Sequence, residues 1–422
     1  MTIKVLHLCT HDIKGGAATA AYRLHAALNT TEASSQMLVA KKDSFDPQVF
    51  TPRSRTMRLK VDFAYRGDRW PLKFYRHRTT YDWNIGWFPN GIVSEIERYP
   101  SDIIHLHWTA LGFIPIGALR RLRRPIVWTQ YDMAGFTGGC HYSGVCKRYE
   151  GACGACPMLG SQQEFDLSRQ TWRSKARAWA DLPLTIVTSS RWLTDCAKAS
   201  SLFRNQRIER IPSGVDINRY KPQDKVAARN LFGLPQDKKL ILFVAMRALT
   251  DQRKGIQYLI PALKQLAARW QGEAELVILG AVKSKDAPDF GLPAHYMGYL
   301  HDEVSMTLLY SAADVFVAPS VQDNLPNTVG EALACGTPCI AFDIGGLPDM
   351  LNHQQNGYLV RPFEVDDLAA GIHWVLEDNE RRAALAAQAR QTAEERFDIS
   401  KIAAQYVALY DDILNAGASN LP

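Results

Sequence analysis

Short apolar runs recur along the first half of the chain, and a stretch long enough for a helix follows most of them. The runs lie at 3–8, 36–40, 102–107, 125–129 and 184–188. They are continuous rather than alternating, which is typical of parallel strands covered on both faces. Gly15 and Gly16 separate the first run from an Ala- and Leu-rich stretch at 17–28 that predicts a helix. Strand, glycine turn and helix are the start of a doubly wound α/β domain.

The same rhythm restarts after the segment at 211–216. New runs follow at 239–245, 274–280, 313–319 and 337–341. Two successive series of strands and helices predict an α/β protein with two Rossmann-like domains, at 1–210 and 211–398. In such domains ligands bind beyond the carboxyl ends of the strands, so we expect a site in a cleft between the domains.

Composition narrows the class of protein. With 422 residues, of which 46% are apolar and 22% charged, the chain is typical of a globular protein. No apolar run approaches the ~18–20 residues of a membrane helix, and the N-terminus lacks the order of a secretion signal. We therefore expect a cytoplasmic protein. The eight cysteines are then expected to be thiols or metal ligands rather than disulfides.

Two cations follow the first strand predicted in the second domain. Arg247 and Lys254 stand in the segment 245–255, where both can reach the predicted cleft. Fixed cations there would stabilise the charge that accumulates on a leaving diphosphate. A solvated basic loop fits the same residue types.

Two carboxylates and two glycine turns add to this candidate site. The segment 319–336 contains Asp323 and, on a helix expected to begin near Thr328, Glu331. A carboxylate on a helix can accept both hydroxyls of a ribose. The segment 342–349 predicts a glycine turn into a helix, whose backbone N–H groups would hold an anion. The Gly15–Gly16 turn can do the same, although such a pair is also common in plain turns.

Taken together, these motifs resemble the retaining glycosyltransferases of the GT-B fold, glycosyltransferase family 4. The resemblance covers nearly the whole chain. It implies that Arg247 and Lys254 bind the donor diphosphate and that Glu331 binds the ribose. It also implies that Asp323, one methylene shorter than the family's Glu, faces the donor sugar. The same segment supplies the remaining donor-binding candidates: Asn324, Leu325, Asn327 and Thr328.

The resemblance has further implications. Gly15 and Gly16 match the family's N-terminal phosphate loop, and a last helix at 399–417 is expected to cross back onto the first domain. The donor would be a UDP-sugar or a GDP-sugar, with the base bound near 298–301. No metal would be needed for catalysis, because the acceptor hydroxyl attacks from the face that the diphosphate leaves and a phosphate oxygen takes its proton. Protein groups would mainly position the reactants and stabilise charge.

The first domain supplies the acceptor candidates. The segment 128–146 resembles a subgroup found in bacterial polysaccharide synthesis, including colanic-acid-type enzymes, in which a His-Asp pair follows the strand. Here Tyr131 and Asp132 occupy those positions. His105 and His107 end an earlier strand, and His107 is the better candidate for an acceptor contact, although both also fit packed strand histidines. A saccharide acceptor, lipid-linked in surface-polysaccharide assembly, is implied.

Four cysteines fall in the loop at 138–158: Cys140, Cys146, Cys153 and Cys156. Four thiols in one loop of a cytoplasmic protein suit a structural zinc site, with His141 as a spare ligand. Free thiols or a redox pair fit the same pattern. A zinc ion with four protein ligands would brace the loop and leave no open position for chemistry.

Basic residues are concentrated between 53 and 78, where aromatic residues are interleaved. Such a segment can lie on anionic lipid at the inner face of the membrane, and a solvated helical face is the alternative. A nucleic-acid-binding protein is another interpretation, but it leaves the cleft motifs unexplained, so we expect no nucleic acid. A GT-B sugar-nucleotide epimerase or an inactive paralog also stays open, because Asp323 and Tyr131 depart from the family pattern.

Overall fold

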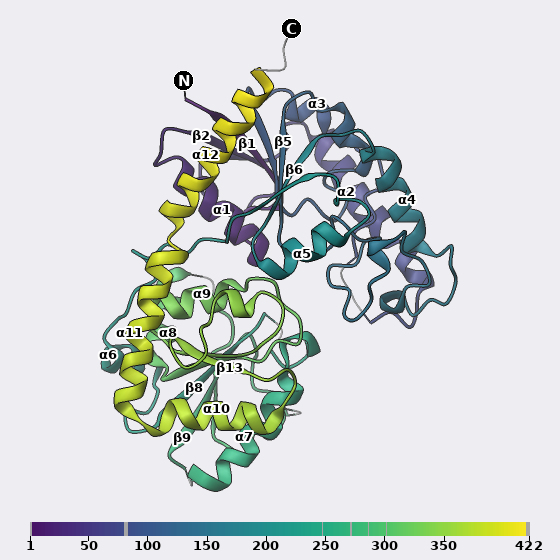
Figure 1. Cartoon of the computed structure of the whole chain (residues 1–422). Helices are drawn as coiled ribbons and strands as arrows, with labels where there is room; N and C mark the ends of the chain where they lie inside the picture. The colour runs from purple at the N-terminus through teal and green to yellow at the C-terminus, as the bar shows by residue number, and fades with distance from the viewer. Residues whose placement is uncertain are drawn as a thin grey trace. The chain divides into compact units, whose positions relative to one another are not determined.

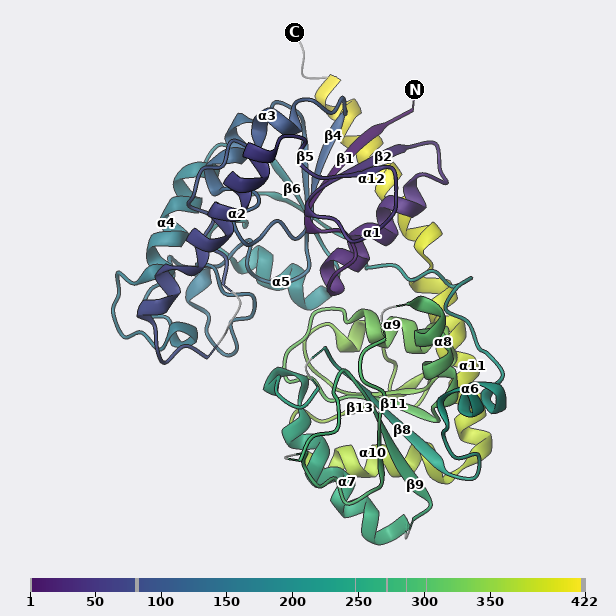
Figure 2. The ribbon, with the colours of Figure 1, turned by 180° about the vertical axis from the view of Figure 1, so that it is seen from behind.

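The computed structural model describes residues 2–79, 83–246, 248–270, 272–285, 287–300 and 302–418. The chain divides into two compact units: residues 1–212 with 400–422, called here the first unit, and residues 213–399, called the second unit. Each unit is a parallel sheet with helices on both faces (Figures 1 and 2). The predicted fold class, two Rossmann-like α/β domains, is confirmed.

The first unit contains a seven-stranded sheet in the order β3-β2-β1-β4-β5-β6-β7, parallel at every pairing. The strands are β1 (Lys4–His11), β2 (Ser34–Lys41), β3 (Val49–Phe50), β4 (Ile103–Leu106), β5 (Ile126–Gln130), β6 (Leu184–Thr188) and β7 (Arg207–Arg210). Every residue of β4, β5 and β6 is buried. This burial on both faces is why their sequences are continuous apolar runs.

Helices and short 3-10 turns surround this sheet. They are α1 (Gly16–Leu28), α2 (Arg55–Arg69), η1 (Pro71–Phe74), α3 (Val93–Ile96), η2 (Ile116–Arg121), η3 (Arg148–Glu150), η4 (Pro157–Leu159), α4 (Leu167–Trp179), α5 (Arg191–Ala199) and α12 (Ile399–Ala418). The long helix α12 lies against the sheet of the first unit (Figure 1). Its Tyr410 hydroxyl lies 2.7 Å from Nδ1 of His105, and its Tyr406 hydroxyl lies 2.9 Å from the hydroxyl of Thr129. The end of the chain is thereby hydrogen-bonded to β4 and β5.

The second unit contains a six-stranded parallel sheet in the order β10-β9-β8-β11-β12-β13. Its strands are β8 (Lys239–Val244), β9 (Ala274–Leu279), β10 (Ala294–Tyr296), β11 (Val315–Ala318), β12 (Cys339–Phe342) and β13 (Gly357–Val360). Its helices and turns are α6 (Lys225–Phe232), η5 (Gln252–Lys254), α7 (Ile256–Trp270), α8 (Glu303–Ala312), α9 (Asn327–Ala334), η6 (Leu347–Asp349), α10 (Val365–Glu377) and α11 (Asn379–Arg396).

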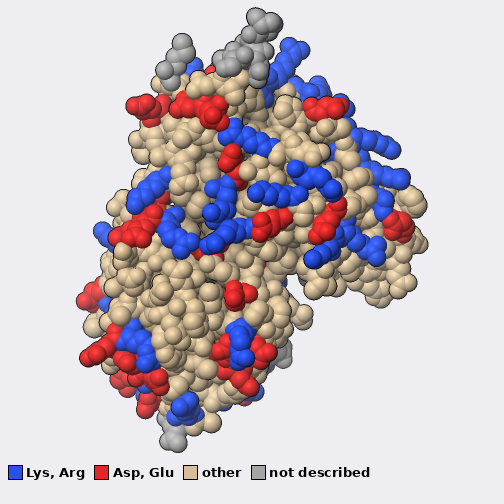
Figure 3. Space-filling model, in the orientation of Figure 1, with Lys and Arg blue, Asp and Glu red and all other residues tan. Residues whose placement is uncertain are grey.

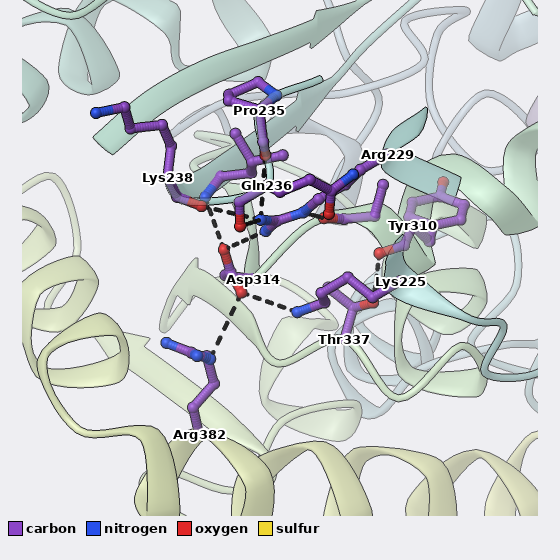
Figure 4. A network of polar contacts seen from close by, with 11 residues as sticks. Lys225, Arg229, Pro235, Gln236, Lys238, Tyr310, Asp314, Thr337 and Arg382 are labelled. Carbon is purple, nitrogen blue, oxygen red and sulfur yellow. Dashed lines mark hydrogen bonds and ion pairs between the residues drawn. The ribbon is translucent and has the colours of Figure 1, made fainter. Parts of the chain in front are cut away.

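A buried carboxylate fixes the amino end of β11 (Figure 4). Asp314 accepts hydrogen bonds from the guanidinium of Arg229 at 2.7 Å, the backbone N–H of Leu240 at 2.7 Å and the ammonium of Lys225 at 2.8 Å. Burial raises the pKa of Asp314, but Lys225, the Leu240 amide and Arg229 outweigh burial, so the pKa is lowered. A buried charge is tolerated only when it is paired in this way. The clamp positions the strand whose opposite end leads to Asp323.

One predicted element is wrong. After Gly346 the sequence predicted the start of a helix, but η6 is a single turn of three residues. Pro348 lies within it, and the side-chain amide of Asn356 donates to the carbonyl of Met350 at 3.1 Å. That carbonyl is therefore satisfied by a side chain rather than by a further helical turn. The predicted glycine turn is therefore followed by a single 3-10 turn instead of a full helix.

Four short strands were not predicted: β3, β7, β10 and β13. They are only two to four residues long, and β7 and β10 contain no buried residue. β7 and β10 lack the apolar run on which the prediction depended, and β3 is only two residues long. Within the described residues, no helix is both long and apolar enough to cross a membrane.

Candidate functional site

The carboxyl edge of the sheet in the second unit contains a buried ion pair. Asp323, in the loop after β11, is 6% exposed. Its Oδ2 accepts from the ammonium of Lys254 at 2.6 Å and the hydroxyl of Ser320 at 3.2 Å, and a guanidinium nitrogen of Arg253 lies 3.4 Å away. Burial raises the pKa of Asp323, but Lys254 and Arg253 outweigh it and bring the pKa to about 2. Asp323 is therefore a carboxylate, and it positions both cations.

Glycines bring three loops together around Asp323. Gly255 has a φ of 79°, and a Cβ there would lie 1.6 Å from the carbonyl oxygen of Pro319. Gly345 has a φ of 57°, and a Cβ there would lie 2.1 Å from the carbonyl oxygen of Asp323. Only glycine combines a positive φ with such a close approach. The loops after β8, β11 and β12 consequently meet at one point.

Glu331 lies on α9, close to the same edge. Its side chain accepts from the hydroxyl of Tyr310 at 3.0 Å, and the residue is 6% exposed. The other donor-binding candidates lie between Asp323 and the first turn of α9. Asn324 and Leu325 are buried, whereas Asn327 and Thr328 are half-buried.

Arg247 lies outside the described residues. Sequence reasoning missed Arg253 and Ser320, which the structure brings to Asp323. Arg253 directly precedes Lys254, but the sequence does not distinguish an arginine that contacts Asp323 from one that is exposed to solvent. No sequence signal separates Ser320 from other loop serines.

The first unit offers a different kind of edge. Gly15 is the residue before α1 and has a φ of 96°, with open space where a Cβ would be. Its conformation rather than crowding therefore favours glycine. Gly16 is exposed and begins the helix. The turn follows β1, so it lies at the carboxyl edge of this sheet.

Three buried histidines lie behind this edge: His7, His105 and His107. The Nε2 of His107 lies 2.7 Å from Nδ1 of His7, and its Nδ1 lies 3.0 Å from the hydroxyl of Tyr131. Both ring nitrogens of His107 are thus bonded within the first unit. His105 is similar, since its nitrogens meet Tyr410 and Thr129. These contacts favour the packed-strand interpretation of both His105 and His107.

Burial strongly affects the protonation of this network. It lowers the pKa of His107 to about 3 and the pKa of His7 and His105 well below the usual value. The rings are accordingly neutral at physiological pH. Their nitrogens form the one group of three or more His, Cys, Asp or Glu ligand atoms in the described part of the chain that lie within 4.8 Å of one another. His7 and His107 are hydrogen-bonded to each other, and the ring of His105 packs against both.

A carboxylate at the end of β5 is held by a histidine from the cysteine-rich loop. Asp132 Oδ2 lies 2.6 Å from Nδ1 of His141 and accepts from the indole N–H of Trp108 at 3.1 Å. Burial raises the pKa of Asp132, but His141, the Ala134 amide and Trp108 outweigh burial and lower it. Asp132 and Tyr131 are half-buried. Nδ1 of His141 is thus taken by Asp132, and the role of His141 as a spare metal ligand stays a prediction.

The sequence of each unit matches a known protein family. Residues 15–219 match the family described as Glycosyltransferase Family 4, and residues 224–392 match Glycosyl transferases group 1. The chain belongs to these glycosyltransferases.

Curated relatives agree with this assignment. An uncharacterized glycosyltransferase of Methanocaldococcus jannaschii is 33% identical over 53% of this chain and 59% of its own length. A D-inositol 3-phosphate glycosyltransferase of Xylanimonas cellulosilytica is 29% identical over 73% of this chain and 71% of its own. A sulfoquinovosyl transferase of Arabidopsis thaliana is 29% identical over 72% of this chain and 55% of its own.

Solved structures show the same fold. A sucrose-phosphate synthase from Thermosynechococcus elongatus superimposes with a TM-score of 0.67 at 20% identity, over 98% of this chain and 100% of that one. Anabaena HepE in complex with UDP and glucose gives a TM-score of 0.66 at 18% identity, over 97% and 100%. This glycosyltransferase therefore has the GT-B fold that the sequence resemblance implied.

The cysteine-rich loop of this glycosyltransferase folds around a small cavity. Cys140, Cys146, Cys153 and Cys156 all line it, and all four are free thiols. Within the described residues, no three of their sulfurs lie within 4.8 Å of one another. The loop thus collects the thiols without bringing them to ligand distance of a common point.

Proposed function

We propose that this glycosyltransferase moves a hexose from a nucleoside-diphosphate donor, a UDP-sugar or a GDP-sugar, to a saccharide acceptor. The transfer retains the anomeric configuration, and catalysis uses no metal. The observation that carries the proposal is the buried pairing of Lys254 and Arg253 with Asp323 at the carboxyl edge of the second sheet. The solved UDP complex of the similarly folded Anabaena protein supports a nucleotide donor.

Lys254 and Arg253 provide the charge that a diphosphate needs. A leaving diphosphate gains negative charge as the glycosyl bond breaks, and cations held in place stabilise that state without reorganising. Asp323 holds both cations in place and faces the donor sugar. Arg247, which follows the same strand, would add to this group.

Glu331 would bind the ribose of the donor. The hydroxyl of Tyr310 orients its carboxylate from within the unit. Asn324, Leu325, Asn327 and Thr328 lie between Asp323 and Glu331 in the chain and would contact the nucleotide diphosphate. In the first unit Gly15 and Gly16 would present backbone N–H groups to an anion.

The acceptor contacts would come from the carboxyl edge of the first sheet. Tyr131 supplies a hydroxyl backed by His107, and Asp132 supplies a carboxylate oriented by His141 and Trp108. Hydroxyls, carboxylates and indole rings are suited to a sugar, which presents both polar groups and apolar C–H faces. His107 supports Tyr131 in this proposal and does not itself contact the acceptor.

A lipid-linked acceptor in surface-polysaccharide assembly would explain the surface of α2 and η1, which belong to the first unit (Figure 2). Four large apolar side chains are more than half exposed there: Leu59, Phe63, Trp70 and Phe74. Basic side chains alternate with them. Apolar anchors among cations fit the interface of anionic lipid at the inner face of the cytoplasmic membrane.

Vesicle sedimentation tests the membrane contact. The wild type should pellet with anionic phosphatidylglycerol vesicles and not with neutral phosphatidylcholine vesicles. The double variant Leu59→Ser, Phe63→Ser should lose this binding, while Val226→Ser, an exposed apolar residue of the second unit, should keep it. Equal pelleting of the wild type and the double variant would contradict the contact.

On the face drawn in Figure 3, Lys and Arg are interspersed with Asp and Glu. A nucleic-acid site needs a concentrated positive surface, which this face does not present.

Product analysis tests the transfer. Incubation with a panel of labelled UDP- and GDP-sugars, with and without EDTA, should give a glycosylated product whose anomeric configuration matches the donor. Lys254→Ala and Glu331→Ala should each lose most turnover with an unchanged circular dichroism spectrum. Product of inverted configuration, or near wild-type turnover in both variants, would contradict the mechanism. A released free sugar-nucleotide isomer would instead show an epimerase.

A further inference from the structure

The cysteine-rich loop carries chemistry that glycosyl transfer does not use. We propose that Cys140, Cys146, Cys153 and Cys156 bind a structural zinc ion, which fixes the loop that presents His141 to Asp132. The proposal goes beyond sugar transfer, since metal content can be measured whether or not a sugar is moved.

The four sulfurs face one small cavity although they come from separate parts of the loop. Cys140 pairs with Trp83 in an isolated antiparallel bridge, Cys146 lies in a turn, and Cys153 and Cys156 flank a two-residue spacer. In zinc sites Zn–S distances are about 2.3 Å, so binding one zinc ion requires these sulfurs to move closer together. The cavity gives them the space to do so.

A backbone N–H group points at one of the sulfurs. The N–H of Gly138 donates to Sγ of Cys153 at 3.1 Å. Such bonds from backbone N–H groups are common around metal-bound cysteine sulfurs and orient them.

The backbone between the last two cysteines is held in an unfavourable conformation. Cys153, Gly154 and Ala155 have φ values of 53°, 101° and 41°. Non-glycine residues avoid this region and remain there only where the surroundings impose it. The conformation turns both Cys153 and Cys156 toward the cavity, so the strain coincides with the gathering of the thiols.

Cations lie where a zinc–thiolate centre would need them. Four thiolates around one zinc ion carry a net charge of about −2. Arg148 lines the cavity, and the buried ammonium of Lys175 is close enough to interact electrostatically with Cys153 and Cys140. Both cations would offset the charge of the centre in an environment where an unpaired charge is costly.

The position of the cysteine-rich loop determines where the His141 side chain lies. His141 directly follows Cys140, its carbonyl accepts from the N–H of Met133 at 2.9 Å, and its side chain meets Asp132. Lys175 donates to the carbonyls of Ala134 and Thr137 in the same segment. A metal bound through Cys140 would therefore fix the position of the His141 ring relative to Asp132.

Metal analysis of the purified full chain tests the proposal. Inductively coupled plasma mass spectrometry should find about one zinc per chain. Cys153→Ser and Cys156→Ser should lose it, and the matched control Cys196→Ser, a half-buried cysteine of the same unit outside the loop, should retain it. Less than a tenth of an equivalent in wild type grown with added zinc, or undiminished zinc in Cys156→Ser, would overturn the proposal.

A second measurement uses wild type alone, so its result does not depend on whether the cysteine variants fold. Cobalt(II) added to metal-free wild type should give the intense visible absorption of a tetrahedral thiolate site and saturate at about one equivalent. The absence of that absorption, or its replacement by a disulfide between the loop cysteines, would count against a metal site. Because neither measurement requires sugar transfer, failure here leaves the proposed glycosyltransferase function intact.

Discussion

The two sheets of the molecule have the same topology class but differently built carboxyl edges. In the second unit the edge is charged, with two cations held against the buried carboxylate of Asp323. In the first unit the edge is assembled from hydrogen bonds between His107 and Tyr131 and between His141 and Asp132, with neutral histidines behind it. Under the proposed function, the difference would suit an anionic ligand at the edge of the second unit and a hydroxyl-rich ligand at the edge of the first.

Removing a cation from the charged edge should have the largest effect. Lys254→Ala should lower kcat by about 10²–10³-fold, because a fixed charge that stabilises the leaving diphosphate is lost. Steady-state kinetics with a saturating acceptor measure this effect. The control Lys264→Ala removes a lysine that forms an exposed ion pair with Asp289, and it should behave as wild type.

Substitutions at the hydrogen-bonded edge of the first unit should reduce activity less than Lys254→Ala does. They should change the kinetic parameters of the acceptor and not those of the donor. A hydrogen bond to a charged group contributes about 1.5–3 kcal/mol, so His141→Ala should lower kcat/KM for the acceptor by about 10–100-fold. The KM for the donor should stay unchanged. His295→Ala is the matched control, because it breaks a histidine–carboxylate pair with Glu275 in the second unit. A loss confined to donor KM would reverse the roles assigned to the two edges.

The neutral histidines should make the first unit sensitive to acid. Their pKa values are lowered in the folded state, so the unfolded chain binds more protons below about pH 6.5. Stability is therefore full above that pH and falls as the pH drops, by about 1.4 kcal/mol per pH unit for each histidine. Urea unfolding followed by tryptophan fluorescence at pH 7.5 and 5.5 measures this slope, and His105→Gln should reduce it. An unchanged slope in that variant would contradict the buried neutral network.

The smallest predicted effect concerns the last helix. Tyr410→Phe removes the hydrogen bond to His105 and should lower the free energy of unfolding of the first unit by about 1 kcal/mol. The equivalent change at Tyr299, an exposed tyrosine of the second unit, should have little effect. Chemical denaturation of both variants at pH 7.5 measures the difference.

Sequence predicted the main strands because β4, β5 and β12 are buried throughout and contain continuous apolar runs. It missed β7 and β10, which contain no buried residue. The limit at the site is different. Lys254 and Asp323 were each recognised as candidates, but their ion pair joins residues 69 positions apart and depends on loop closure through Gly255.

The histidine contacts show the same limit. Replacement of a family histidine by Tyr131 suggested a lost His-Asp pair, yet the cysteine-rich loop folds back and brings His141 to Asp132. The sequence also did not show that both ring nitrogens of His107 are hydrogen-bonded within the first unit. A strand histidine has the same sequence pattern whether its side chain faces a ligand or another histidine. Such pairings depend on tertiary structure rather than on local pattern.

Donor binding by the charged edge is the central claim, and isothermal titration calorimetry tests it most directly. Titration of UDP- and GDP-sugars into folded wild type should show saturable binding of at least one donor. Lys254→Ala should weaken that binding at least tenfold, while Lys264→Ala should leave it unchanged. Equal affinity in all three proteins, or no heat of binding from any nucleotide sugar, would contradict the account.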